Sequence, residues 1–139
     1  MYRRNVSSGS PFETEIGFSR TVRLGPLIVV AGTAPIDASG GTACRGDVYG
    51  QTRRCLEIVA AAIAEAGGAL ENTIRTRILL TDISRWREVA TAHAEVFGEI
   101  RPASTIVEVA ALIGPELLVE IEADAYCAIA AKVPSAEGR

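Results

Sequence analysis

Short runs of β-branched residues alternate along the chain with longer segments in which apolar residues recur at helical spacing. Apolar runs at 18–24 and 27–33 flank Gly25-Pro26, and this arrangement predicts a β-hairpin. Residues 34–46 are dense in Gly, Pro, Asp and Ser, which predicts a loop. The first third of the chain is therefore expected to be two paired strands followed by an irregular connection.

Two segments carry the three- and four-residue spacing of amphipathic helices. Asp47 offers an N-cap for the first helix, which Gly67-Gly68 closes. Its stripe consists of Val48, Thr52, Cys55, Val59, Ala62 and Ala66. Asp82 or Ser84 can cap the second helix, which ends at Gly98 ahead of Arg101-Pro102. The stripe of the second helix consists of Trp86, Val89, His93, Val96 and Phe97.

The remaining regular segments are predicted strands. Residues 73–81 alternate, with Ile74, Thr76, Ile78 and Leu80 on one side and Arg75, Arg77 and Leu79 on the other. Two further strands cover 105–109 and 117–128 and are joined through a turn at Gly114-Pro115. Residues 1–15 show no sustained period and are assigned to an N-terminal arm, 16–131 to a single domain and 132–139 to a C-terminal tail.

The order β-β-α-β-α-β-β predicts an α+β fold, an α/β sandwich in which both helices cover one face of a mixed sheet. One layer of helices leaves the other sheet face uncovered, and its β-branched residues would face water. Burial of that face between subunits would remove this cost, so we expect a homo-oligomer.

Composition narrows the classes of function. The chain has 139 residues, 48% of them hydrophobic and 22% charged, which is typical of one folded domain. A net charge of −3 provides no overall attraction for nucleic acid or an anionic membrane. The start of the chain lacks the apolar region of a secretory signal, and the longest uncharged apolar stretch, 24–36, is too short for a membrane span. A cytoplasmic location with all three cysteines as thiols is expected.

The residue types exclude several chemistries. The only lysine, Lys132, lies in the tail, which argues against Schiff-base catalysis. A zinc site would have to gather Cys44, Cys55, Cys127 and His93 from distant segments, so no metal is expected. Neither a Gly-x-Ser-x-Gly elbow nor a glycine-rich phosphate loop is present, so neither a hydrolase triad nor a nucleotide cofactor is expected.

The last predicted strand carries acids at period two, because Glu120, Glu122 and Asp124 all fall on one face. One interpretation is a solvated sheet face or edge that discourages unwanted pairing. The other is that one acid sits in a cleft between subunits, where desolvation raises its pKa and allows general acid or base catalysis. His93 lies on the apolar stripe of its helix and is interpreted as structural.

Several strings together resemble the reactive intermediate deaminase family, also called the YjgF type. They are Gly17-Phe18-Ser19-Arg20, Gly32, Gly46-Asp47, Gln51, Ala66-Gly67, Arg75-Thr76, Thr81-Asp82, Arg101-Pro102-Ala103, Val107-Glu108-Val109 and Val119-Glu120-Ile121-Glu122-Ala123. The resemblance covers about residues 16–128. It implies a chorismate-mutase-like subunit in a homotrimer with a ligand cleft between neighbouring subunits, and hydrolysis of enamines and imines without metal or cofactor.

The resemblance also implies roles for individual residues. Glu120 occupies the position of the family's acid, which would activate water and shuttle a proton. The small-molecule substrate would be bound by Phe18, Ala31, Gly32, Ala90, Arg101, Ser104 and Ile106.

The chain departs from the family pattern at several of these positions. Phe18 stands where typical members have Tyr, Ala90 stands for Asn, and Ala31 stands for a small hydroxyl residue. The largest departure is Ser104, because typical members have an arginine there that grips the substrate carboxylate. Loss of that charge-assisted pair would cost about 1.5–3 kcal/mol.

Two interpretations of function therefore remain open. One is a divergent deaminase with an altered substrate, in which Ser104 or Arg101 makes a different contact. The other is a trimer that binds a small molecule or regulates a partner with little turnover. RNA cleavage, a third function associated with the family, fits poorly with an acidic chain.

Overall fold

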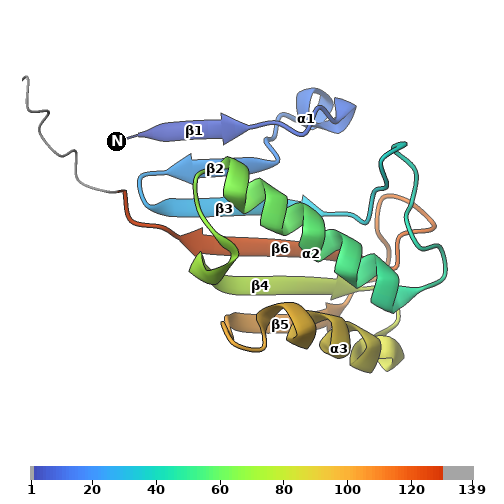
Figure 1. Ribbon diagram of the computed structural model, residues 1–139. Helices are drawn as coiled ribbons and strands as arrows, with labels where there is room; N and C mark the ends of the chain where they lie inside the picture. The colour runs from blue at the N-terminus through green and yellow to red at the C-terminus, as the bar shows by residue number, and fades with distance from the viewer. Residues whose placement is uncertain (1, 130–139) are drawn as a thin grey trace, which may run out of the picture.

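A six-stranded mixed sheet carries two long helices, α2 and α3, on one of its faces (Figure 1). The computed structural model describes residues 2–129. Its elements are β1 (Arg3–Val6), α1 (Pro11–Ile16), β2 (Thr21–Leu24), β3 (Leu27–Thr33), α2 (Val48–Glu65), η1 (Leu70–Asn72), β4 (Thr73–Leu80), η2 (Ile83–Arg85), α3 (Trp86–Phe97), β5 (Ala103–Glu108) and β6 (Val119–Tyr126). This α+β architecture, with a mixed sheet and both long helices on the same side, confirms the predicted fold class.

The strand order is β1-β2-β3-β6-β4-β5, so the last strand in sequence lies in the middle of the sheet. The predicted hairpin forms from β2 and β3, which pair antiparallel around Gly25-Pro26. β6 pairs antiparallel with both β3 and β4, and β5 pairs parallel with β4. The turn at 114–115 therefore belongs to a crossover between β5 and β6, not to a hairpin. This topology places the acidic strand at the centre of the sheet, where its partners fix its register.

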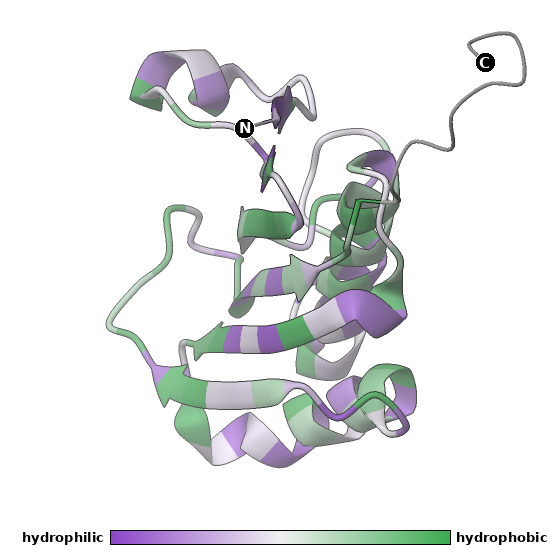
Figure 2. Cartoon of the chain, turned by 90° about the vertical axis from the view of Figure 1, so that its left-hand side faces the viewer, coloured by the Kyte–Doolittle hydropathy of each residue, from purple (hydrophilic) through white to green (hydrophobic). Residues whose placement is uncertain are grey.

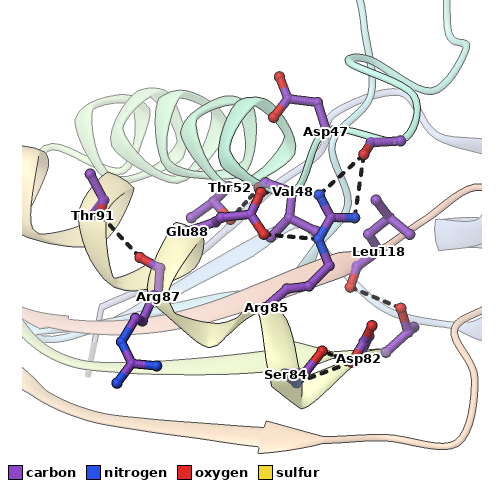
Figure 3. A network of polar contacts seen from close by, with 12 residues as sticks. Asp47, Val48, Thr52, Asp82, Ser84, Arg85, Arg87, Glu88, Thr91 and Leu118 are labelled. Atoms are coloured by element: carbon purple, nitrogen blue, oxygen red, sulfur yellow. Dashed lines mark hydrogen bonds and ion pairs between the residues drawn. The ribbon is translucent and has the colours of Figure 1, made fainter.

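Local signals define where α2 and α3 begin. The Asp47 side chain accepts the Gly50 N–H at 2.9 Å, which caps α2 as the sequence predicted. Asp82 accepts the Ser84 N–H at the start of η2, and the chain continues from there into α3. Figure 3 shows how Arg85 ties the two helices together. Its guanidinium donates to the Gly46 carbonyl before α2 and to the Glu88 carboxylate in α3.

The core lies between the sheet and the two helices, in two adjoining clusters. The first joins α2 to β1, β3 and β6 through Val6, Ile28, Val30, Val59, Ala62, Ile63, Ala66, Ala123 and Ala125. The second joins α2 and α3 to β4 and β6 through Val48, Cys55, Leu56, Ile78, Leu80, Val89, Phe97, Val119 and Ile121. Apolar and polar residues alternate along the strands in Figure 2, as expected for a sheet with one covered face. All three cysteines are free thiols, in agreement with the sequence analysis.

The prediction that Ile74 shares the buried side of its strand was wrong. The register between β4 and β6 shifts between Thr73 and Arg75, and this irregularity turns the Ile74 side chain outward. Ile74 is 51% exposed, whereas Thr73 and Thr76 on either side are buried. A bulge adds one residue to a strand, which shifts the alternation of faces by one position.

The N-terminal segment, which shows no sustained period in its sequence, contains two short elements. β1 pairs antiparallel with β2 at one edge of the sheet. α1 begins at a capping box in which Ser10 and Glu13 bond reciprocally, and it ends at Gly17 with a φ of 88°. A four-residue strand and a six-residue helix are too short to show a period. The domain boundaries at 16 and 131 stay a prediction, and the predicted tail at 132–139 lies outside the described residues.

The sheet face opposite α2 and α3, called the open face here, carries a group of apolar side chains that remain exposed to solvent. Leu24, Leu27, Val29, Val107 and Tyr126 are each 39–54% exposed. Between residues 2 and 129, no helix has the length and hydropathy needed to cross a membrane. A group of exposed apolar side chains of this kind is typical of an interaction surface.

Candidate functional site

Glu120 lies on β6 and points to the open face, as the alternation predicted. Its neighbours Val119 and Ile121 are fully buried against the helices, whereas Glu120, Glu122 and Asp124 are partly exposed. β4 places Leu79 beside Glu120 and Arg77 beside Glu122. The three acids therefore form one row along the open face.

The three acids of this row have different surroundings. Arg77 lies 3.5 Å from carboxylate oxygens of both Glu122 and Asp124, so these two acids share one cation. Among the described residues, no such ion pair or side-chain hydrogen bond involves the Glu120 carboxylate. An acid that is partly desolvated and not directly paired is a candidate for chemistry, whereas the other two are accounted for by their ion pairs.

A β-bulge in β3 brings backbone against Glu120. Val30 pairs with Ala123 and Thr33 pairs with Ile121, so Ala31 and Gly32 together oppose the single residue Glu122 of β6. A Cβ atom added at Gly32 would lie 2.7 Å from Glu120 Oε1. Only glycine leaves room for the carboxylate in this position, which explains the residue type at the bulge.

Arg20 is part of this site, although neither its spacing nor its surroundings in the sequence predict a role there. Its Nη1 donates to the Gly32 carbonyl at 2.8 Å and to Thr33 Oγ1 at 3.0 Å, which fixes the bulge. Its guanidinium carbon also lies 5.7 Å from the centre of the Phe18 ring. Arg20 belongs to the Gly-Phe-Ser-Arg string of the family resemblance, and that string was the only available signal. The structure therefore groups Phe18, Arg20, Gly32 and Glu120.

Burial raises the pKa of Glu120 above its usual value. The positive charge of Arg20 lowers this pKa in part, and the negative charge of Glu122 adds to the increase. Burial also lowers the pKa of Arg20, which is far above neutrality in any protein. Glu120 can therefore hold a proton at a higher pH than an ordinary glutamate and can both donate and accept protons.

The other residues implied by the resemblance lie elsewhere in the chain. Arg101 and Ser104 line a hollow of about 310 Å³ with His93, Ala94, Phe97, Gly98 and Pro102. The Ile106 side chain is half-buried against the core cluster beneath α3. Ala90 is also half-buried, on α3, and does not line the hollow. A single chain therefore carries two separate groups, one around Glu120 and one at the turn from α3 to β5.

Substitution of Gly32 by alanine should lower activity with little change in stability. The new Cβ atom meets the far end of the Glu120 side chain, so the carboxylate moves while the strands stay in place. A displacement of about 1 Å can cost about a hundredfold in rate. The turnover and melting temperature of Gly32→Ala should be compared with those of Gly41→Ala, whose Cβ would lie 3.4 Å from Asp37. Equal activity in the two variants would show that the close approach has no role in catalysis.

Several known proteins resemble this chain in sequence and fold. The family described as Endoribonuclease L-PSP matches residues 9–127. The crystal structure of Rv2704 from Mycobacterium tuberculosis, described as a member of the YjgF/YER057c/UK114 family, superposes with a TM-score of 0.81 at 54% identity and covers 90% of this chain and 99% of that one. The uncharacterized protein SCO2049 of Streptomyces coelicolor is 39% identical over 88% of this chain and 91% of its own length. The 3-aminoacrylate deaminase RutC of Acinetobacter baylyi is 33% identical over 72% and 79%, respectively.

Proposed function

The chain belongs to the Endoribonuclease L-PSP family of YjgF type, and on that premise we propose that it hydrolyses a reactive enamine or imine to a carbonyl compound and ammonia. The observation that carries the proposal is the Glu120 carboxyl, half-buried on the open face beside the Gly32 bulge, with a raised pKa. The relative from Acinetobacter baylyi supports the reaction class, because its name describes the deamination of an enamine.

The proposed reaction needs one group that both donates and accepts a proton. Protonated Glu120 gives its proton to the imine nitrogen, or to the β-carbon of an enamine to form the iminium ion. The resulting carboxylate takes a proton from a water molecule while the oxygen of that water attacks the imine carbon. Glu120 then protonates the amine of the adduct. The C–N bond breaks with its electron pair, and the hydroxyl proton returns to Glu120 as the carbonyl forms. One water is consumed and one ammonia is released.

We propose that the working unit is a homotrimer in the cytoplasm, with the small-molecule substrate bound between subunits. Two features support this assembly. Exposed apolar side chains share the open face with Glu120, so a subunit that covers this face would complete the desolvation of Glu120. The Ser104 group of one chain is also separate from its own Glu120, so in the proposed trimer a neighbour would supply the second half of a joint site.

A second candidate function is binding without turnover. It is favoured by Ser104, an exposed neutral hydroxyl at the position where the family resemblance implies a cation. RNA cleavage has less support, because the chain carries a net charge of −3 and the open face bears a row of acids that would repel phosphates.

The two candidates differ in product formation. Imines generated in place by an amino-acid oxidase should release ammonia faster when the protein is added, and the acceleration should scale with protein concentration. If no imine from a broad amino-acid panel reacts faster while a carboxylate ligand raises the melting temperature, the protein binds without turnover.

A further inference from the structure

His93 reaches the Ser104 hydroxyl through a buried threonine. His93 Nε2 lies 2.9 Å from Thr76 Oγ1, and Thr76 Oγ1 lies 2.8 Å from Ser104 Oγ. Thr76 is fully buried in β4, whereas Ser104 is exposed on the neighbouring strand β5. Three side chains from α3, β4 and β5 therefore form one chain of hydrogen bonds, and both of its end residues, His93 and Ser104, line the hollow.

A threonine hydroxyl has one hydrogen to donate, so Thr76 donates either to Ser104 or to His93. If Nε2 of His93 carries a proton, the ring donates to Thr76 and Thr76 donates to Ser104. The hydrogen of Ser104 is then available to a ligand in the hollow. With the ring proton on Nδ1 the chain runs the other way, and Ser104 can only accept.

The surroundings of His93 are suited to a neutral ring with one fixed tautomer. The imidazole packs against Phe97 with 4.8 Å between ring centres, and burial lowers its pKa. Thr76 and Ser104 face it from β4 and β5 and are neutral, and among the residues that line the hollow the only charged group is Arg101. A neutral ring keeps a proton on only one nitrogen, so Nε2 either donates to Thr76 or accepts from it.

We propose that His93 carries its proton on Nε2, so that His93 and Thr76 are positioning residues that turn Ser104 into a hydrogen-bond donor and the hollow receives an acceptor group such as a carboxylate or carbonyl oxygen. Arg101 strengthens this preference. It lines the same hollow in a left-handed conformation, with a φ of 55°, and its N–H bonds the Phe97 carbonyl at 2.7 Å. A residue other than glycine rarely adopts this conformation, and such strain is often found at functional sites. The inference concerns recognition and does not depend on the reaction at Glu120.

The hydrogen-bonded chain from His93 through Thr76 to Ser104 is called the relay here. The protein contains a single histidine, so nitrogen NMR can observe the ring of this relay without assignment ambiguity. The ring nitrogens of the labelled protein should show the tautomer with the proton on Nε2. Addition of 2-oxobutyrate, a carboxylate probe, should shift these signals, whereas sec-butylamine, a donor at neutral pH, should not. A proton on Nδ1, or a larger response to the amine, would overturn the proposal.

Variants of the relay test its individual links. Ser104→Ala, at an exposed position, should abolish the response of His93 to 2-oxobutyrate and weaken binding of the probe by about fivefold, as expected for one neutral hydrogen bond. Thr76→Val retains the buried shape and should have the same effect, whereas Thr76→Ser retains the hydroxyl and should restore the response. Failure of Thr76→Ser to restore it, or a full response in Ser104→Ala, would contradict the relay. Both readouts are independent of ammonia release, so they distinguish failure of this inference from failure of the proposed reaction.

Discussion

Glu120→Gln should lose nearly all ammonia release while its fold is retained. Glutamine has the same shape but can neither give nor take a proton, and removal of a general acid–base group typically costs about 10²–10⁴-fold in rate. The measurement is the initial rate of ammonia release with imines generated by an amino-acid oxidase. The nearby Arg20 guanidinium keeps its hydrogen bonds to the Gly32 carbonyl and the Thr33 hydroxyl, so the change breaks no ion pair among the described residues.

The matched control is Glu122→Gln, two residues along the same strand and on the same face. Glu122 lies 3.5 Å from Arg77 and is accounted for as an ion-pair partner. Its replacement should leave most of the rate, because Arg77 keeps Asp124 as a partner. If the two variants lose activity equally, the row of acids acts through its charge, and Glu120 has no individual role.

Because the pKa of Glu120 is raised, Glu120→Gln should also change how the melting temperature depends on pH. Burial disfavours the ionised form in the folded chain, so the stability of the wild type falls as the pH rises from the unfolded pKa through the folded one. Glu120→Gln should therefore melt at a higher temperature than the wild type at pH 7, and the difference should vanish in acid. A lower melting temperature at pH 7 would show that Glu120 stabilises the fold instead.

Val29→Glu should convert the protein into monomers and remove its activity. Val29 is 41% exposed on the open face and pairs across the sheet with Asp124. In the proposed trimer this change would place an unpaired carboxylate beside an acid at the interface, and burial of such a charge costs several kcal/mol. Light scattering should report the mass of one chain, and ammonia release should fall by at least about tenfold, because the neighbour's half of the site is lost.

The control for this prediction is Ala61→Glu, on the exposed side of α2 in the helix layer. It adds the same charge away from the open face and should leave both mass and activity unchanged. Activity in a monomeric Val29→Glu protein would refute the joint site. A wild type that is itself monomeric, with Glu120 in open solvent, would refute the assembly.

Much of the fold could be predicted from sequence because its signals are local. Asp47 caps α2 through a hydrogen bond three residues away. The acids of β6 alternate with apolar residues, which placed Glu120 on the face away from the helices. Features that depend on pairing between distant strands could not be predicted. The exposure of Ile74 follows from a register shift against β6, and no residue near Ile74 signals it.

The site was only partly predictable for the same reason. Glu120, Gly32 and Phe18 followed from the family resemblance, and the structure brings them together around Arg20. Arg20 lies 12 residues before its acceptor at Gly32 and 100 residues before Glu120, so no spacing rule connects them. The hydrogen bonds from His93 to Ser104 cross three elements, and the helical stripe alone gave His93 only a structural role.

The position of β5 makes an unassembled chain prone to aggregation in the cell. This strand is the outer edge of the sheet, and it presents the β-branched run Thr105-Ile106-Val107 with one side of its backbone unpaired in a single chain. Such an edge is a template for strand addition and aggregation. If the protein works as the proposed trimer, a subunit that fails to find partners is an aggregation hazard as well as inactive, which favours sequences that assemble promptly after synthesis.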